Sequence, residues 1–497
     1  MMRSLLAGRR LSAALAVCAL GATMVWPAAP PEVAAGDPNP VCSYCAGGEY
    51  HPITPTRIFE TRSSNGIVPI NDVAPLGAKP LTNAATPPSF DVQVLGLGDP
   101  EFENAWLPDD VTASGDVLAL AVGVTVVSPT SAGYLEAYAT GARPAQRTSI
   151  VNFPAGQTVA NMAILRPSAD GEITIELSGG SASGSAQVVI DIFGWFSSST
   201  FMVSGGAMPM TAHGGRLIAV TPGRIFDSRS ANPPVFSPMT QRAVTIRGAT
   251  LVGTSTVIVP DDPDVVGVLL NVTAVRPNAN TFVSVVPEDV PQGELPSTSN
   301  LNVNANQVRA AMVMVPLGTD GKVRLFNGPA TSHLVVDVLG YIERIPDDTR
   351  VGRVIPLTAP FRAFDTRAAG FGGVPLGPGQ AEDWSFAAFT SSVTIDGIPV
   401  GNQSALLGNL TNAKLTRQYL TVPVDPGYLT MYPTPAVSNT PPPMISNLNS
   451  RESITGDNRA VPNMALVKYG ANSTVRVFNA AGYAHYLLDV SAVVLAD

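Results

Sequence analysis

Short apolar runs rich in β-branched residues recur along most of the chain, separated by segments rich in Gly, Pro, Asn and Asp. Examples are Val122–Val127, Leu269–Val275 and Leu406–Thr411. Runs of this length between turn residues are typical of strands that are covered on both faces. Asp170-Gly171 and Asp320-Gly321 add the dipeptide that favours a tight hairpin. The pattern predicts an all-β protein and leaves little room for long helices.

Two sequence motifs organise the strand pattern, and each occurs three times. The first, Pro-x-Arg-x-Phe-acid-Thr/Ser-Arg, opens each unit, and the second, an apolar run with one aspartate, closes it. The opening motifs are Thr54–Arg62, Thr221–Arg229 and Ala359–Arg367, and the closing runs are Val188–Phe196, Leu334–Ile342 and Tyr486–Val494. The chain therefore contains three related units.

Each unit is long enough to be a domain with its own core. Turn signals at intervals of roughly 8–12 residues predict about seven to nine strands in each unit, as in a sandwich or a small barrel. A propeller is the alternative, but its blades of about 40–50 residues are much shorter than these units. We expect three tandem β-sandwich-like domains of jelly-roll type: repeat 1 at 51–200, repeat 2 at 217–344 and repeat 3 at 354–497, joined by linkers at 201–216 and 345–353.

The first 35 residues have the pattern of a secretory signal peptide. Arg3, Arg9 and Arg10 precede the apolar run Leu11–Trp26, and Val33-Ala34-Ala35 fits a cleavage site. A retained membrane anchor is the alternative, but the apolar run is shorter than the ~20 residues that a span needs. Residues 1–35 are therefore expected to be removed on export, which would leave a mature chain without a membrane span.

Two cysteines remain in the expected mature chain, both in the segment 36–50. Cys42 and Cys45 form a Cys-x-x-Cys sequence among Pro and Gly residues. In an oxidising compartment a local disulfide is the expected state. A redox motif is the alternative, but a redox Cys-x-x-Cys normally opens a helix, and no helix pattern surrounds this one.

Composition excludes several classes of function. The net charge is −9, which is unsuited to binding nucleic acid. The sequence contains no His-x-x-x-His, Cys/His cluster, calcium loop, Gly-x-Ser-x-Gly elbow or Walker loop. We therefore expect no cofactor, no metal site and no catalytic residues.

The two motifs contain the charged residues that need an explanation. Alternation along a strand places Arg57 and Phe59 on the same side, and hence the arginine inward. The closing aspartates lie in apolar runs, where an unpaired carboxylate is costly. We therefore expect the buried aspartate of each unit to form a structural clasp, with the motif arginine or with backbone amides, that joins the first and last strands of the unit. A recurring ligand site is the alternative. The residues are Arg57, Glu60, Arg62 and Asp191 in repeat 1, Arg224, Asp227, Arg229 and Asp337 in repeat 2, and Arg362, Asp365, Arg367 and Asp489 in repeat 3.

Four tyrosines are candidates for stacking on a sugar ring. Tyr134 and Tyr138, and likewise Tyr428 and Tyr432, are spaced by four residues on one side of a strand. Ordinary strand packing is the alternative explanation. Repeat 2 has Phe282 at the corresponding first position, so the platform is not common to all three repeats.

The pairing of Arg-x-Phe-Asp-Thr-Arg with Val-Val-Asp-Val-x-Gly-Tyr resembles the β-rich repeats of secreted actinobacterial proteins, many of them uncharacterised. The resemblance covers nearly all of the mature chain and implies a repeat type without an activity. Repeat 3 departs from it at Ala492-Val493, where the others have Gly194-Trp195 and Gly340-Tyr341.

We therefore expect an exported, non-catalytic protein of the cell envelope or the extracellular space, with a binding or scaffold role. Its partner would be a cell-wall or extracellular glycan, or another envelope protein. The alternative is an extracellular hydrolase that acts on polysaccharide. A pair of converging acids in one repeat only would favour the hydrolase.

Overall fold

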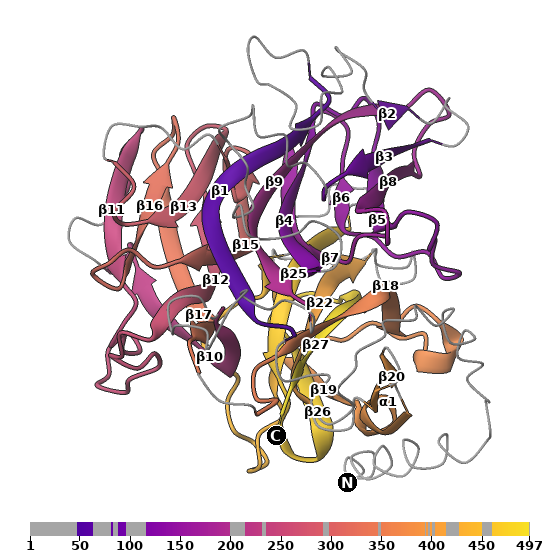
Figure 1. The fold of residues 1–497 in the computed structure, drawn as a ribbon. Coiled ribbons are helices and arrows are strands. Elements are labelled where there is room, and N and C mark those ends of the chain that lie inside the picture. The colour runs from indigo at the N-terminus through magenta and orange to yellow at the C-terminus, as the bar shows by residue number, and fades with distance from the viewer. Residues whose placement is uncertain are drawn as a thin grey trace, which may run out of the picture. The chain divides into compact units, whose positions relative to one another are not determined.

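The computed structural model describes residues 47–62, 81–82, 88–95, 116–198, 214–230, 235–291, 298–345, 349–392, 394–395, 398–399, 403–413, 427–449 and 460–496. The protein is all-β, as the sequence predicts: strands make up most of these residues, and the one α-helix among them, α1 (Ala387–Ser392), has six residues. Gly171 and Gly321 have a left-handed backbone in the Asp-Gly turns that join strands. Figure 1 shows strands through the described part of the chain, with α1 as a short helix.

Each repeat contributes two antiparallel sheets built on the same order of four strands, and the first sheet of repeat 1 has β2 (Leu81–Thr82) as a fifth strand. In the first sheet, the strand with the opening motif lies beside the closing strand. In repeat 1 this sheet has the order β1 (Tyr50–Glu60), β9 (Ser185–Ser197), β4 (Val117–Val127) and β7 (Val159–Leu165). The second sheet has the order β3 (Ser89–Gln93), β8 (Glu172–Ser178), β5 (Gly133–Ala139) and β6 (Val151–Phe153), and β2 (Leu81–Thr82) pairs with β9.

Repeats 2 and 3 follow the same order. The sheets of repeat 2 are β10 (Arg216–Asp227), β17 (His333–Glu343), β12 (Val265–Val275) and β15 (Val308–Pro316), and β11 (Thr240–Thr245), β16 (Lys322–Asn327), β13 (Thr281–Pro287) and β14 (Leu301–Val303). Those of repeat 3 are β18 (Val354–Asp365), β27 (His485–Leu495), β22 (Gln403–Ala413) and β25 (Val461–Lys468), and β19 (Gln380–Ser385), β26 (Thr474–Asn479), β23 (Tyr428–Pro433) and β24 (Leu448–Asn449). A short hairpin, β20 (Thr394–Ile395) and β21 (Ile398–Pro399), follows α1.

The two sheets of each repeat share one hydrophobic cluster. In repeat 1, Val124 and Ile190 of the first sheet belong to the same buried cluster as Leu135 and Ile175 of the second sheet. A fourth cluster takes residues from the first sheets of all three repeats, among them Phe193, Met312 and Leu407. The first sheets are therefore covered on both faces, which explains why their strands are apolar throughout.

Backbone hydrogen bonds join the starts of the three opening strands in a closed series. In each bond, the backbone amide of the first or second residue of one opening strand donates to a backbone carbonyl just before the opening strand of the next repeat. The bonds run from Tyr50 N to Gly215 O at 2.7 Å, from Leu217 N to Gly352 O at 2.8 Å and from Val354 N to Gly48 O at 2.9 Å.

Three charged side chains lie immediately before those donors. The Glu49 carboxylate is 3.2 Å from Nη2 of Arg353 and 3.7 Å from Nε of Arg216, and all three side chains are buried. One acid thus lies between two cations at equivalent positions of the three repeats. The sequence placed these residues in an N-terminal segment and two linkers, and it gave no reason to expect them in contact.

A β-bulge changes the side on which the motif arginine lies. Arg57 pairs with Asp191, but Phe59 pairs with Ile190, so one extra residue is inserted in the motif strand. Arg57 and Phe59 therefore face opposite sides of the sheet. The same shift occurs in repeats 2 and 3. The expectation that arginine and phenylalanine share the inward side is wrong, because strict alternation does not pass through a bulge.

Candidate functional site

The structure places each closing aspartate directly opposite the first arginine of its own motif. All three aspartates are at most 2% exposed, and each accepts two hydrogen bonds from that arginine. The distances from Nε and Nη2 to the carboxylate oxygens are 2.9 and 3.5 Å for Arg57 and Asp191, 2.8 and 3.5 Å for Arg224 and Asp337, and 2.7 and 3.0 Å for Arg362 and Asp489.

The remaining motif residues extend each pair into a network of four charges. In repeat 2, Nη1 of Arg224 lies 3.4 Å from Asp227, whose carboxylate also accepts two bonds from Arg229 at 2.9 and 2.6 Å. Arg362, Asp365 and Arg367 repeat this arrangement, as do Arg57, Glu60 and Arg62. The second arginine of each motif is about half exposed, whereas the first is mostly covered.

Burial and ion pairing act in opposite directions on these carboxyl groups. Burial raises the pKa of Asp337 to about 6, although Arg224 acts to lower it. The pKa values of Asp191 and Asp489 are raised for the same reason. Burial also acts to raise the pKa of Asp227, but the hydrogen bonds and charge of Arg229 outweigh it, and the net shift is downward.

Two of the three aspartates also receive a bond from a neighbouring repeat. The Ser149 amide donates to Asp489 at 3.3 Å, which joins repeat 1 to repeat 3. The Ser446 amide bonds Asp337, which joins repeat 3 to repeat 2. The clasps therefore lie at the borders between repeats. Within the described part of the chain, Asp191 accepts hydrogen bonds from Arg57 alone.

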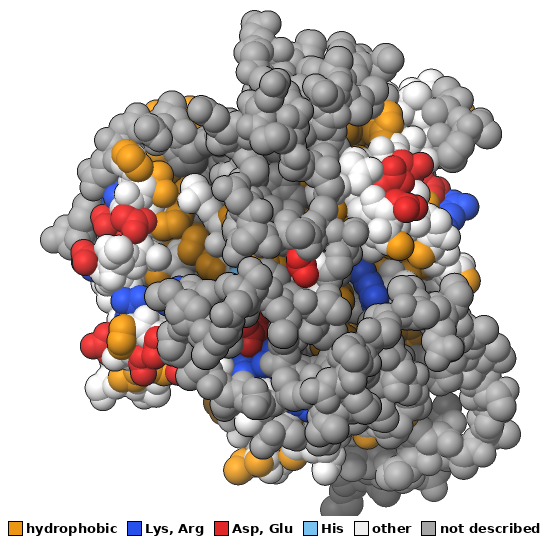
Figure 2. Space-filling model, viewed as in Figure 1, with side chains coloured by type: hydrophobic (Ala, Val, Ile, Leu, Met, Phe, Trp, Pro, Cys, Tyr) orange, Lys and Arg blue, Asp and Glu red, His pale blue; other side chains and the backbone are white. Residues whose placement is uncertain are grey.

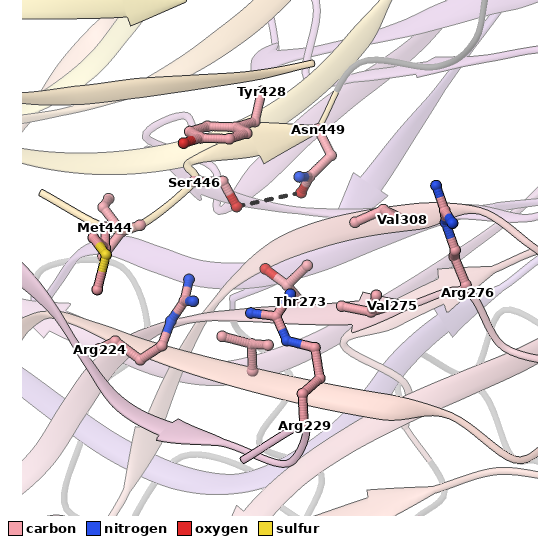
Figure 3. Close-up of a pocket in the computed structure, with 12 residues that line it drawn as sticks. Arg224, Arg229, Thr273, Val275, Arg276, Val308, Tyr428, Met444, Ser446 and Asn449 are labelled. Atoms are coloured by element: carbon pink, nitrogen blue, oxygen red, sulfur yellow. Dashed lines mark hydrogen bonds between the residues drawn. The ribbon is translucent and has the colours of Figure 1, made fainter. Parts of the chain in front are cut away.

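A cavity of about 540 Å³ opens where repeat 2 meets repeat 3. Figure 3 shows Arg224, Arg229 and Thr273 on one side of it, with Tyr428 and Asn449 on the other. Its lining residues are Arg224, Arg229, Thr273, Val275, Arg276, Val308 and Val335 of repeat 2, and Tyr428, Met444, Ile445, Ser446 and Asn449 of repeat 3. The site thus combines motif arginines and a candidate stacking tyrosine that lie far apart in the sequence.

Two groups in the cavity have no partner among the described residues. The Thr273 hydroxyl is buried and makes no hydrogen bond there. The exposed Arg276 side chain forms no ion pair with those residues, and its backbone is left-handed, with φ 44°. On the face that Figure 2 shows, the described charged side chains form small groups.

The structure separates the two members of each tyrosine pair. Tyr428 is 37% exposed and Tyr134 is half-buried, whereas Tyr138 and Tyr432 are buried. The Tyr138 hydroxyl donates to Glu176 at 2.8 Å. Only the first tyrosine of each pair is therefore accessible to a ligand. Cys42 and Cys45 lie outside the described residues.

Repeat 1 has a pair of acids that the other repeats lack. Glu136 and Glu176 are cross-strand neighbours on β5 and β8, both buried, and both accept bonds from Arg147 at 2.5 and 2.9 Å. Burial raises the pKa of Glu136 despite the bond from Arg147. Ser284 and Phe326 occupy these places in repeat 2, and Thr430 and Phe478 occupy them in repeat 3.

Across the described ranges, no three His, Cys, Asp or Glu side chains gather closely enough to hold a metal ion. No helix in the same ranges has the length and apolar character needed to cross a membrane.

No protein-family model matches the chain, and no curated protein matches it by sequence. Solved structures with some similarity include the N-terminal CBM22-1-CBM22-2 tandem domain of Xyn10C from Paenibacillus barcinonensis, at 11% identity over 45% of this chain and 78% of that one, with a TM-score of 0.15. A triple jelly-roll protein of an archaeal virus aligns at 10% identity over 81% of this chain and 82% of that one, with a TM-score of 0.14. These scores are too low to support any conclusion about fold or function.

Sequence reasoning missed the groups that complete the site. Thr273 and Arg276 do not stand out in the sequence as ligand groups, Asn449 marks a recurring strand without indicating a site, and Met444 lies in a proline-rich stretch that reads as a loop. Thr125, Thr273 and Thr411 share one position of the fold, because each pairs with the residue two places before its closing aspartate. Their distances from that aspartate along the sequence differ, so the sequence alone did not show this equivalence.

Proposed function

We propose that this is an exported, non-catalytic binding protein of the cell envelope that recognises glycan in the cavity between repeats 2 and 3. The observation that supports the proposal is the meeting of Arg224 and Arg229 with Tyr428 around one cavity. These residues were candidates on separate grounds, as charged motif residues and as a stacking ring.

The size and lining of the cavity suit one or two sugar rings. Cavities of about 300–1,000 Å³ are typical of small-molecule sites. Tyr428 and the 83% exposed Met444 offer apolar surface for the face of a ring. The hydroxyl of Thr273, the amide of Asn449 and the guanidinium groups offer hydrogen bonds to its edge.

The charges around the cavity favour an acidic sugar. Three arginines line it, and among the described residues two carboxylates, those of Asp227 and Asp337, pair with them. One positive charge is left over within this described set, on Arg276. Arginine binds carboxylates through two parallel hydrogen bonds, so a uronic acid or another carboxylated sugar is the expected ligand class.

We also infer that each repeat is a separate jelly-roll sandwich. Eight strands in two four-stranded sheets around a shared core support this architecture. Export, removal of residues 1–35 and a Cys42–Cys45 disulfide remain proposals from the sequence. Intact and reduced masses of secreted protein would test all three.

The acid pair of repeat 1 makes a polysaccharide hydrolase the second candidate. Glu136 and Glu176 lie opposite each other, as two hydrolytic carboxyls must. Against this function, both side chains are buried, Arg147 binds both, and the cavity described above does not include them. Release of reducing ends that is lost in a Glu136→Gln variant would favour the hydrolase.

A glycan array probed with the mature chain tests the binding function. We expect signal on glycans that carry carboxylates, and loss of that signal in Tyr428→Ala. Val437→Ala is the matched control, because Val437 is a 70% exposed apolar residue of the same repeat outside the cavity. Equal binding by the wild type and Tyr428→Ala, or binding to no glycan, would refute the proposal.

A further inference from the structure

The border between repeats 3 and 1 has the same polar framework as the border that holds the cavity. Asn271 of repeat 2 donates to the Ser446 carbonyl of repeat 3, and the Ser446 amide bonds Asp337. In the same way, Asn409 of repeat 3 donates to the Ser149 carbonyl of repeat 1 at 2.5 Å, and the Ser149 amide bonds Asp489 at 3.3 Å. The two borders are therefore built by the same contacts between equivalent residues.

The ligand-facing groups are also repeated at the second border. Thr411, the counterpart of Thr273, has a buried hydroxyl that bonds no described residue. Arg367 is 44% exposed, as Arg229 is 47% exposed, and each is paired with the aspartate of its own motif.

Tyr134 takes the place of Tyr428 and lies close to the motif arginine of the other repeat. Strands β18 and β5 are in contact. Burial lowers the pKa of Arg362, but Asp489, Asp365 and the Tyr134 hydroxyl raise it, and the net shift is upward. An accessible ring, a motif arginine and a threonine without a described partner thus occupy the equivalent positions at the second border.

The border between repeats 1 and 2 keeps the motif arginines Arg57 and Arg62 but lacks the other features. Gly123 replaces the framework asparagine, and Phe282 replaces the tyrosine. The buried Thr125 hydroxyl is not among the unpartnered groups. These three differences occur together at one border, whereas the other two borders keep the asparagine, the tyrosine and the threonine hydroxyl without a described partner.

We propose that the border between repeats 3 and 1 is a second glycan site, formed by Tyr134, Asn152, Arg362, Arg367 and Thr411. Asn152 is the counterpart of Asn449, because each accepts a hydrogen bond from the hydroxyl of the serine three residues before it. The protein then binds two ligands per chain, and the third border binds none. This inference rests on the proposed function of the first site. Two sites on one rigid chain would also raise the avidity for a polymer that reaches both.

The two sites differ at the position two residues before the framework serine. Arg147 stands two residues before Ser149, at the place that Met444 holds relative to Ser446. It is 39% exposed and bound to Glu136 and Glu176. The second site therefore offers a guanidinium where the first offers an apolar side chain.

Titration calorimetry with tetragalacturonate, and with neutral cellotetraose for comparison, tests the inference. We expect about two tetragalacturonate molecules to bind per mature chain, with Tyr134→Ala and Tyr428→Ala each leaving one site and the double variant leaving none. An aromatic hot spot predicts at least a ~30-fold weaker affinity at each altered site. Phe282→Ala is the matched control and should keep two sites.

Tyr134→Phe and melting curves separate loss of the ring from loss of the fold. The phenylalanine variant should keep the second site, and each alanine variant should melt as the wild type does. One bound molecule that is unaffected by Tyr134→Ala would overturn the second site and leave the first intact. Absence of binding by every protein would contradict the proposed function itself.

Discussion

The side-chain amide nitrogen of Asn161 donates to the side-chain oxygen Oδ1 of Asn409 at 2.9 Å, across the border between repeats 1 and 3. Asn463 and Asn271 form the equivalent bond, at 2.8 Å, between repeats 3 and 2. At the third border the two positions hold Gly123 and Ala311. Both members of that pair are therefore absent together, which avoids a buried amide without its partner.

The two asparagines of a pair should be coupled in their effect on stability. Asn409→Gly leaves the buried Asn161 amide short of one partner, and we expect a loss of about 1–3 kcal/mol in the free energy of unfolding. The double variant Asn161→Ala, Asn409→Gly copies the third border and should cost less than the sum of the two single changes. Denaturant unfolding of all three variants measures the coupling. Additive losses would contradict the account.

Asp337→Ala should destabilise the protein by about 3–5 kcal/mol, because it leaves the Arg224 guanidinium without its buried partner. Asp320→Asn is the control, since Asp320 is 69% exposed and its pair with Lys322 should contribute little. The melting temperatures of the two variants and the wild type show whether Asp337 has a structural role as a clasp or belongs to a binding site. A melting temperature unchanged by Asp337→Ala would contradict the clasp.

The raised pKa of Asp337 gives that contribution a predictable dependence on pH. Its pKa is about 6 in the folded protein, against an ordinary value of 3.8 for an aspartate. Stability from this group is therefore fully present below pH ~4 and is lost as the pH rises through 6. Relative to Asp337→Asn, the wild type should gain on the order of 3 kcal/mol between pH 7 and pH 4. A difference that is constant, or that shrinks as the pH falls, would contradict the shift.

Glu49→Gln should be destabilising because it leaves Arg216 and Arg353 buried side by side. We expect a loss of about 3–5 kcal/mol, as for other buried pairs that lose one partner. Glu49→Gln combined with Arg353→Met removes one positive charge again and should recover part of the loss. Unfolding free energies of the single and double variants test this. No recovery in the double variant would argue against charge as the cause.

Arg147→Met should show whether the acids of repeat 1 are structural. Glu136 and Glu176 would lose the cation that they share, and the protein should lose about 3–5 kcal/mol of stability. Arg143→Met is the matched control and should cost less, since Arg143 is 52% exposed and contacts only Glu176 among the described acids. An Arg147→Met protein of normal stability that acquires hydrolytic activity would favour the catalytic alternative.

The sequence was sufficient for the strands, their repetition and the charged motifs, since these depend on local patterns. It could not reveal what covers the second face of each first sheet. Phe193 and Met312 are apolar because other repeats pack on them, and a pattern along one strand does not name its distant neighbour. The bulge at Arg57 was also hidden, because a bulge reverses the side of a residue without a fixed sequence signal.

A crystal structure of the mature protein with tetragalacturonate tests the central claim most directly. The account predicts ligand density between repeats 2 and 3, with a sugar ring against Tyr428, a carboxylate at Arg276 or Arg229 and a hydrogen bond from the Thr273 hydroxyl. Ligand bound elsewhere on the protein, with this cavity empty, would contradict it.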